Sequence, residues 1–315
     1  MRFYPFKFEP IFKARIWGGQ KLREVFGKNI PADAKIGESW ELADLPQDKS
    51  VIVNGELAGL TLAEAIARYP AQITGDAGFC GRFPLLIKLL DAEDILSVQV
   101  HPDAETCRRM GKGDPKTECW YVISAAPGAF IYKGLKKGVT RGDFADAIRR
   151  GEVAELLEKV PVEAGQCHFL PAGTPHSIGP GLLIAEIQTP SETTYRVFDF
   201  NRVDERGRAR ELHIEEALES IHFDGGAEEL PVTTAGRLVD CEYFKIDKME
   251  QAEGSEVPLA PGEVRVLVII SGYGAIEGAA GGCVEFAGGQ TLLLPAVCEG
   301  RLRCAGETTY LTVTI

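Results

Sequence analysis

The stretch GQCHFLPAGTPHSIG, Gly165 to Gly179, is the segment from which the fold is most readily predicted. It fits the spacing G-x5-P-x-G-x2-H, in which Gly165, Pro171, Gly173 and His176 hold the fixed positions. Glycine and proline allow the chain to turn sharply between two strands. Such a turn would carry His176 into the mouth of a β-barrel or β-sandwich. The segment therefore predicts a histidine held at the start of a strand.

Short apolar or alternating runs surround this segment, among them ILSVQVHPD, TECWYVISAAPG and GLLIAEIQTP. Clusters of Gly, Pro and Asp separate them, which is typical of an all-β sandwich or barrel. Residues 61–70, 140–160 and 213–221 differ, because their apolar residues recur at three- and four-residue spacing. We therefore expect a mainly β fold, a jelly-roll sandwich with a few inserted helices.

The sequence pattern changes at about residue 231, where strand-like sequence without helical spacing begins. Residues 231–315 contain strand-like runs and no histidine. A weak repeat links this part to the middle of the chain, because Gly289 precedes Pro295-Ala296 by the spacing that separates Gly165 from Pro171-Ala172. We expect residues 1–230 to form a jelly-roll domain that carries the chemistry. Residues 231–315 would form a second, metal-free, jelly-roll-like domain.

The composition excludes several classes of partner. A net charge of -12 over 315 residues disfavours binding to nucleic acid or to anionic membranes, so an anionic substrate would need a local cluster of Lys and Arg. No apolar run approaches the roughly 20 residues that span a bilayer, and the N-terminal sequence lacks the pattern of a signal peptide. Eight scattered cysteines without a CxxC pair indicate reduced thiols. We expect a cytoplasmic protein.

Two predicted strands each place polar side chains on one face, because side chains at i and i+2 of a strand point the same way. In the first strand these are Ser97, Gln99 and His101. In the second they are Lys116 and Glu118, followed by a tryptophan. Each strand thus offers potential metal ligands beside a polar or basic neighbour.

Gln99, His101, Glu118 and His176 together would supply an amide oxygen, two imidazoles and a carboxylate. This set suits zinc and leaves room for water or substrate, although iron and manganese stay open on ligand type alone. His168 lies eight residues before His176 and is interpreted as a packing or surface histidine. The remaining histidines, at positions 213 and 222, have no ligand partners nearby and are interpreted in the same way.

Several long segments resemble, in order, the type I mannose-6-phosphate isomerases of the cupin superfamily in their short bacterial form. They are WGGQKLREVFG, GESWELAD, FPLLIKLLDAEDILSVQVHPD, PKTECWYVI, LPAGTPHSIGPGLLIAEIQ and TTYRVFDFNR, and with the following RARELHIEEAL they span Trp17 to Leu218. The resemblance implies an aldose-ketose isomerase that interconverts mannose 6-phosphate and fructose 6-phosphate through an enediol. It also implies a cupin fold, one zinc ion per chain, and a monomer or homodimer.

The resemblance assigns zinc to the same four residues that strand spacing suggests, Gln99, His101, Glu118 and His176. It further implies an active site that contains Glu38, Lys88, Lys116, Glu186 and Arg196, with Ser97 helping to hold the phosphate.

Isomerisation needs a group that takes a proton from the sugar, a cation that stabilises the developing oxyanion, and side chains that bind the phosphate. Lys88, Lys116 and Arg196 would supply the positive charge that the acidic chain otherwise lacks. We expect Arg196 to lie near C1 and C2 of the sugar. The base is either Glu186 or a metal-bound water.

Two other functions fit part of the pattern. Two histidines and a carboxylate can form an Fe(II) site of a cupin-type oxygenase. An oxygenase would have no obvious use for Gln99, the two lysines and Arg196. A sugar-phosphate sensor without turnover would not need all the catalytic groups. Without the family resemblance, Lys88 would be interpreted as a lysine at a strand end and Arg196 as an ion-pair partner of Asp199.

Overall fold

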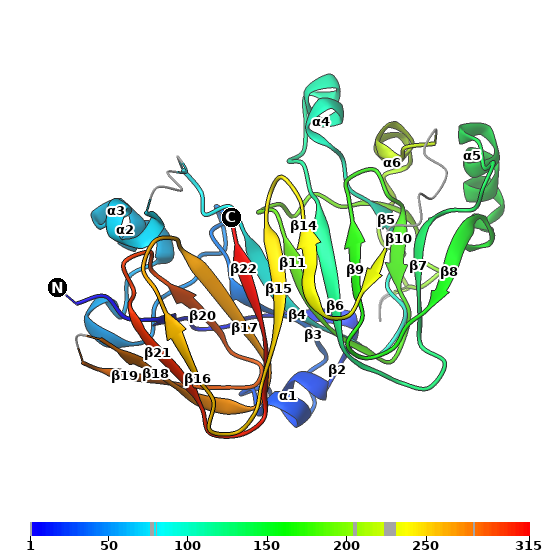
Figure 1. The fold of residues 1–315 in the computed structure, drawn as a ribbon. Coiled ribbons are helices and arrows are strands. Elements are labelled where there is room, and N and C mark those ends of the chain that lie inside the picture. Colours follow the sequence, from blue (N-terminus) through cyan, green and yellow to red (C-terminus); the bar gives the residue numbers. More distant parts are fainter. Residues whose placement is uncertain (1, 76–78, 80, 204–206, 224–230, 280) are drawn as a thin grey trace.

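Four antiparallel sheets form two sandwiches in the computed structural model, which describes residues 2–75, 79, 81–203, 207–223, 231–279 and 281–315 (Figure 1). The first sandwich pairs a seven-stranded with a five-stranded sheet, and the second pairs a six-stranded with a four-stranded sheet. The mainly β, jelly-roll-like architecture expected from the sequence is confirmed.

The seven-stranded sheet contains, in order, β13 (Val232–Thr233), β9 (Cys167–Leu170), β6 (Glu118–Ala125), β11 (Leu182–Gln188), β4 (Leu86–Ala92), β2 (Ile11–Gly19) and β3 (Ile36–Leu42). The five-stranded sheet contains β12 (Tyr195–Phe198), β5 (Val98–Val100), β10 (His176–Ile178), β7 (Phe130–Leu135) and β8 (Leu157–Pro161).

The six-stranded sheet contains β1 (Phe6–Lys7), β20 (Thr291–Leu294), β17 (Arg265–Ser271), β22 (Thr308–Thr314), β15 (Lys245–Gln251) and β14 (Gly236–Asp240). The four-stranded sheet contains β16 (Glu256–Leu259), β21 (Gly300–Cys304), β18 (Tyr273–Gly278) and β19 (Cys283–Ala287).

The helices are short and lie at the edges of the sandwiches (Figure 1). None in the described part of the chain is long and apolar enough to cross a membrane. The α-helices are α1 (Lys21–Phe26), α2 (Leu62–Arg68), α3 (Pro70–Thr74), α4 (Ala104–Met110), α5 (Arg141–Arg150) and α6 (Ile214–Ser220), and the 3-10 turns are η1 (Gly55–Leu57) and η2 (Val153–Leu156).

The helices predicted at 61–70 and 213–221 are confirmed in α2 and α6, but the prediction of helix over the whole of 140–160 is wrong. Thr140 caps α5 with its side chain, as the sequence suggests. Gly151 then adopts φ +72°, a left-handed conformation that ends the helix. The following residues form η2 and the edge strand β8, because their apolar side chains complete the sheet beside β7.

The seven-stranded sheet is buried on both faces, which explains why its central strands are almost continuously apolar. Leu182 and Ile184 of β11 pack between this sheet and the five-stranded sheet. Leu183 and Ala185 belong to another core cluster, which also contains side chains of the six-stranded sheet such as Leu311. One continuous apolar layer therefore joins the two sandwiches.

Both copies of the weak repeat have the same local structure. Gly165 and Gly289 have positive φ, and a four-residue strand begins two residues after each of them, β9 and β20. Proline follows each strand directly. The copies then diverge, because the first continues into β10 with His176 and the second into a turn without a histidine.

The division of the chain at residues 230 and 231 stays a prediction, and residues 224–230 on its N-terminal side lie outside the described part. The sheets exchange strands across this division in both directions. β1 from the start of the chain pairs with β20 of the second sandwich, and β13, which follows residue 231, pairs with β9 of the first sandwich. The cysteines at seven described positions are free thiols, and Cys80 lies outside the described residues.

We predict that the shared core couples the unfolding of the two sandwiches. Leu311→Ala should lower the free energy of unfolding by about 2–5 kcal/mol, because Leu311 is fully buried in the shared layer. All three tryptophans belong to residues 17–120, so a parallel shift of tryptophan fluorescence and circular dichroism in urea would report the coupling. Leu212→Ala, at a position that is 40% exposed, is the control. An unchanged fluorescence transition in Leu311→Ala would contradict the prediction.

Candidate active site and metal centre

Three strands of the first sandwich bring two histidines and a glutamate together. His101 follows β5, Glu118 opens β6 and His176 opens β10. Their ligand atoms all lie within 4.8 Å of one another. Each imidazole Nε2 lies 3.3 Å from a different oxygen of Glu118. All three side chains are buried.

The turn that delivers His176 requires glycine at position 173. Gly173 has φ +84°, and a Cβ there would lie 2.5 Å from the ring of His222. Its N–H donates to the carbonyl of His101, and its own carbonyl accepts from the backbone of His222. The motif therefore fixes His176 and also ties its turn to His101.

Both imidazoles are oriented by their second nitrogen. Nδ1–H of His101 donates to the carbonyl of Thr193 at 2.7 Å, and Nδ1–H of His176 donates to the carbonyl of Thr174 at 2.8 Å. A carbonyl can only accept, so each Nε2 carries a lone pair that faces Glu118. This is the usual arrangement of histidine ligands around a metal ion.

The electrostatics also suit a cation. Burial and the charge of Lys116 lower the pKa of His101 to about 3, and burial lowers that of His176. Burial alone would raise the pKa of Glu118, but its neighbours, led by the charge of Lys116, outweigh burial and hold that pKa well below its usual range. Nε2 of His101 and both Glu118 oxygens lie buried without a hydrogen bond of normal geometry. Neutral imidazoles and an ionised carboxylate are what metal binding requires, so the cluster can hold a metal ion.

Gln99 joins this cluster. It lies opposite His176 in the pairing of β5 with β10, and its amide nitrogen is 3.4 Å from His176 Nε2. Nitrogen and oxygen of an amide are assigned from their neighbours, and a half-turn of the amide would present the oxygen instead. The four predicted ligands are therefore neighbours in the structure.

A cavity of about 560 Å³ opens beside the cluster. It is lined by seven residues that the sequence predicts for the site, Glu38, Lys88, Ser97, Gln99, Lys116, Glu186 and Arg196. The cavity is also lined by residues for which the sequence predicts no role, notably Arg15, Trp17, Glu192 and Arg210.

Lys88 and Glu186 form a buried ion pair on neighbouring strands. They are direct partners in the pairing of β4 with β11, and Lys88 Nζ lies 2.9 Å from Glu186 Oε1. The indole N–H of Trp120 donates to the other oxygen, Oε2, at 3.1 Å. Burial lowers the pKa of Lys88, but Glu186 and Glu38 outweigh it and raise that pKa above its usual value. Lys88 is therefore protonated.

Glu38 is held in a similar way on β3. Arg15 donates to its two oxygens at 2.9 and 3.1 Å, and the indole N–H of Trp40 donates at 2.7 Å. Burial raises the pKa of Glu38, yet the charges of Lys88 and Arg15 lower it more, so the net shift is downward. Glu38 is an ionised group with little freedom to move.

Arg196 lies on β12 and contacts Ser97. Its Nε donates to Ser97 Oγ at 3.1 Å, and its Nη1 donates to the carbonyl of Glu211 at 2.9 Å. The ion pair of Arg196 with Asp199, which the sequence suggested as an alternative, is absent among the described residues. Asp199 instead accepts from Arg202 and Arg210.

The remaining histidines lie outside the metal cluster, as predicted. His168 is fully buried in β9, and its Nε2 lies 3.3 Å from Gln166 Oε1. His213 accepts from the backbone N–H of Arg196. His222 lies 2.8 Å from Asp103, which caps α4.

Sequence reasoning gave no role to Arg15 and Arg210. Arg210 belongs to the segment RAREL, which carries part of the family resemblance. That resemblance indicated that Arg210 lies near the site. Arg15 had no such signal, because only the pairing of β2 with β3 brings it beside Glu38.

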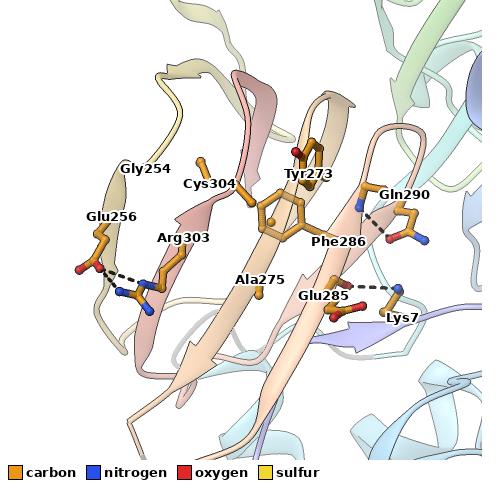
Figure 2. Close-up of a pocket in the computed structure, with 13 residues that line it drawn as sticks. Lys7, Gly254, Glu256, Tyr273, Ala275, Glu285, Phe286, Gln290, Arg303 and Cys304 are labelled. Carbon is orange, nitrogen blue, oxygen red and sulfur yellow. Dashed lines mark hydrogen bonds and ion pairs between the residues drawn. The ribbon is translucent and has the colours of Figure 1, made fainter.

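A larger hollow of about 760 Å³ on the four-stranded sheet, beside Lys7, is a weaker candidate (Figure 2). None of the predicted site residues lines it. Its cations are already engaged, since Arg303 pairs with Glu256 and Lys7 donates to the carbonyl of Glu285. The cavity beside His101 is therefore the candidate active site.

Comparisons with known proteins agree on one family. A family model described as "Phosphomannose isomerase type I, catalytic domain" matches residues 5–120. The "Mannose-6-phosphate isomerase ManA" of Bacillus subtilis is 40% identical over 259 residues, which cover 78% of each chain. The "Mannose-6-phosphate isomerase" of Streptococcus mutans is 38% identical over 281 residues, or 85% of this chain and 87% of that relative.

Solved structures give the same result. The crystal structure of the mannose 6-phosphate isomerase from Bacillus subtilis superposes with a TM-score of 0.87 at 28% identity and covers 99% of both chains. The apo form of the enzyme from Salmonella typhimurium shares the fold with a TM-score of 0.76 at 16% identity, over 98% of both chains.

We predict that metal binding depends on His101 and not on the surface histidine His222. His101→Ala should reduce the metal content, measured by elemental analysis after gel filtration, from about one ion per chain to near zero, because it removes an oriented ligand. His222→Ala should retain the metal, since His222 lies outside the cluster. Full metal content in a folded His101→Ala protein would contradict the ligand assignment.

Proposed function

The chain belongs to the type I mannose-6-phosphate isomerase family, and on that premise we propose that it interconverts D-mannose 6-phosphate and D-fructose 6-phosphate through an enediol. One observation carries the proposal. The Lys88–Glu186 ion pair lines the cavity that opens beside the cluster of His101, Glu118 and His176. A base, a cation and a metal-binding cluster are thus within reach of one bound sugar.

We propose that the resident metal is zinc, one ion per chain, held by Gln99, His101, Glu118 and His176. Two imidazoles, a carboxylate and an amide oxygen form a ligand set that zinc accepts. When bound, zinc would act as a Lewis acid and would orient the sugar oxygens.

Glu186 is the proposed base. Its carboxylate takes the proton from C2 of the aldose and returns it to C1. A second proton moves from the hydroxyl oxygen on C2 to the oxygen on C1, and the two transfers together convert the aldose into the ketose. Lys88 and Trp120 fix both of its oxygens, so the carboxylate is positioned before the sugar binds. Positioning of this kind lowers the entropic part of the barrier.

Three further groups act around the base. Lys88 and Lys116 place positive charge in the cavity, where negative charge develops on the sugar oxygens as the enediol forms. Glu38, ionised and held by Arg15, accepts hydrogen bonds from sugar hydroxyls. Charge-assisted hydrogen bonds of this kind are stronger than neutral ones.

Arg196 and Ser97 are the residues proposed to hold the substrate, and the hydrogen bond between them supports a role at the same end of it. The sequence suggested Arg196 for the C1 and C2 end and Ser97 for the phosphate. The 3.1 Å hydrogen bond between them favours the phosphate end for both. Arginine suits this role because its planar fork binds phosphate oxygens in pairs.

The two alternative functions, an Fe(II) oxygenase and a sugar-phosphate sensor, account for fewer of the residues that line the cavity. An Fe(II) oxygenase would need the two histidines and Glu118, but it would leave the buried Lys88–Glu186 pair without a role. A sensor would not need a base fixed in position. We propose a cytoplasmic enzyme that acts as a monomer or homodimer, in keeping with its acidic composition and free thiols, with residues 231–315 as a metal-free supporting domain.

We predict that zinc-loaded protein converts mannose 6-phosphate into fructose 6-phosphate, in an assay coupled to the product. Chelator treatment should abolish turnover, and added zinc should restore it. The absence of turnover in protein with one zinc per chain would contradict the isomerase. Oxygen consumption with iron would favour the oxygenase.

We predict that Glu186→Gln lowers kcat by about 10²–10⁴, the usual contribution of general base catalysis, while the zinc content and KM change little. The amide keeps the shape of the side chain but cannot accept the proton. As a matched control, Glu250→Gln changes an exposed glutamate of β15 and should leave kcat unchanged. A kcat near wild type in Glu186→Gln would assign the base elsewhere.

A further inference from the structure

The segment 189–194, which joins β11 to β12, carries the acceptor that orients His101. Nδ1–H of His101 donates to the carbonyl of Thr193 at 2.7 Å. The same segment reaches the cavity with Glu192 and Thr194. It forms neither helix nor strand, so the regular backbone bonds of a sheet do not fix the direction of the Thr193 carbonyl. Other contacts must do so.

Ser191 supplies one of these contacts from a buried position, since it is only 1% exposed. Its Oγ accepts from the backbone N–H of Thr193 at 3.1 Å and donates to the carbonyl of Asp114 at 2.9 Å. Thr193 Oγ1 in turn accepts from the backbone N–H of Asp114 at 2.8 Å. The hydroxyl of Ser191 thus uses its donor and an acceptor to tie Thr193 to the residues that precede Lys116.

Thr117 extends these bonds to the other segments that carry ligands. It immediately precedes β6, which opens with Glu118. Its backbone N–H donates to Thr189 Oγ1 at 3.2 Å, and its own Oγ1 accepts from the backbone N–H of Ala172 at 3.2 Å. Ala172 lies in the turn before β10. One network of hydrogen bonds therefore connects the acceptor of His101 with the starts of β6 and β10.

Gln188 holds the backbone of the segment without using the Ser191 hydroxyl. It is fully buried at the end of β11, opposite Glu118 in the pairing with β6. Its Nε2 donates to the carbonyls of Thr189 and Ser191 at 2.9 and 2.7 Å. Loss of the Ser191 hydroxyl would leave both bonds in place. An alanine at position 191 therefore removes the contact with Thr193 while the segment keeps its main support.

Removal of the hydroxyl would affect His101 through the backbone. The N–H of Thr193 and the carbonyl of Asp114 would lose this partner, and polar backbone groups without a partner are unfavourable away from water. The peptide at Thr193 would rotate to find another partner, which would also turn the carbonyl that accepts from His101. Changes to a group that orients a metal-binding histidine typically cost about 10- to 100-fold in metal affinity or activity.

We propose that Ser191 is a positioning residue, which fixes the Thr193 carbonyl and through it the imidazole of His101, and so sets the affinity of the metal site. Ser191 is not among the described residues that line the cavity, so this role involves no contact with the sugar. The inference rests on the metal site of the proposed function, and it does not depend on which sugar the enzyme converts.

The test measures the affinity for zinc by competition with a chelator of known affinity. Ser191→Ala should raise the Kd for zinc about 10- to 100-fold. In protein loaded with Co²⁺ in place of zinc, the visible absorption, which depends on ligand geometry, should change as well. At saturating zinc, kcat for mannose 6-phosphate should fall while KM changes little, because the residues that line the cavity are retained.

Further variants separate positioning from a general loss of stability. Ser220→Ala removes another fully buried serine hydroxyl, which donates to the carbonyl of Glu216 within α6. It should leave the Kd for zinc and the Co²⁺ spectrum unchanged even if the melting temperature falls. Ser191→Thr keeps the hydroxyl and should restore a zinc affinity close to that of the wild type. If Ser191→Ala does not fold, Ser191→Cys takes its place with the same expected rise in Kd, since a thiol is a weak donor and acceptor.

Wild-type zinc affinity and an unchanged Co²⁺ spectrum in folded Ser191→Ala, or in the Ser191→Cys protein that replaces it, would overturn the proposal. Equal losses in Ser191→Ala and Ser191→Thr would assign the effect to packing and would overturn it too. The two proposals fail separately. A protein whose zinc affinity depends on Ser191 but that does not isomerise mannose 6-phosphate would contradict the proposed function alone. An active isomerase whose zinc affinity is indifferent to Ser191 would contradict this inference alone.

Discussion

The carboxylate of Glu118 sets the constraint on which the rest of the site depends. It is fully buried, and an unpaired charge in such a position would be strongly destabilising. Lys116, His101 and His176 surround it, and each comes from a fixed point of the sheets. Because the two imidazoles are neutral, Lys116 alone does not complete the site. A metal ion bound by this cluster would give the carboxylate and the two imidazoles the partner that Lys116 does not supply.

Other buried carboxylates that line the cavity are also paired with positively charged side chains. Glu186 and Glu38 are two more carboxylates within a β-sandwich, and each is held by a cation and by an indole N–H. The tryptophans therefore serve both the packing and the orientation of charge, since Trp40 and Trp120 are themselves almost completely buried. Fully satisfied polar networks of this kind make a core rigid. A rigid floor is what proton transfer over a short distance requires.

None of the four proposed ligands comes from the described residues of the second sandwich, yet that sandwich bears on the site through the shared core. The strands that carry Lys88 and Glu186 present their opposite faces to the six-stranded sheet, where Leu89 and Ala185 belong to the same core cluster as Val266 and Leu311. A buried pair of Lys28 and Glu41, whose lysine also donates to Gly289 of the second sandwich, strengthens this contact. A sheet supported on both faces can hold charged groups in place more firmly than one exposed to water.

The four candidate ligands could be proposed from the sequence alone, because strand alternation and the glycine and proline turn before His176 are local properties of the chain. The sequence also predicted the β class and three helical segments, of which those at 61–70 and 213–221 are confirmed. It missed the end of α5, because a left-handed glycine ends the helix although the helical pattern continues. The partners of each charged group could not be predicted in this way and became known from the folded structure. Asp199 binds Arg202 and Arg210 and leaves Arg196 to Ser97, since these pairings depend on how distant segments pack and not on spacing along the chain.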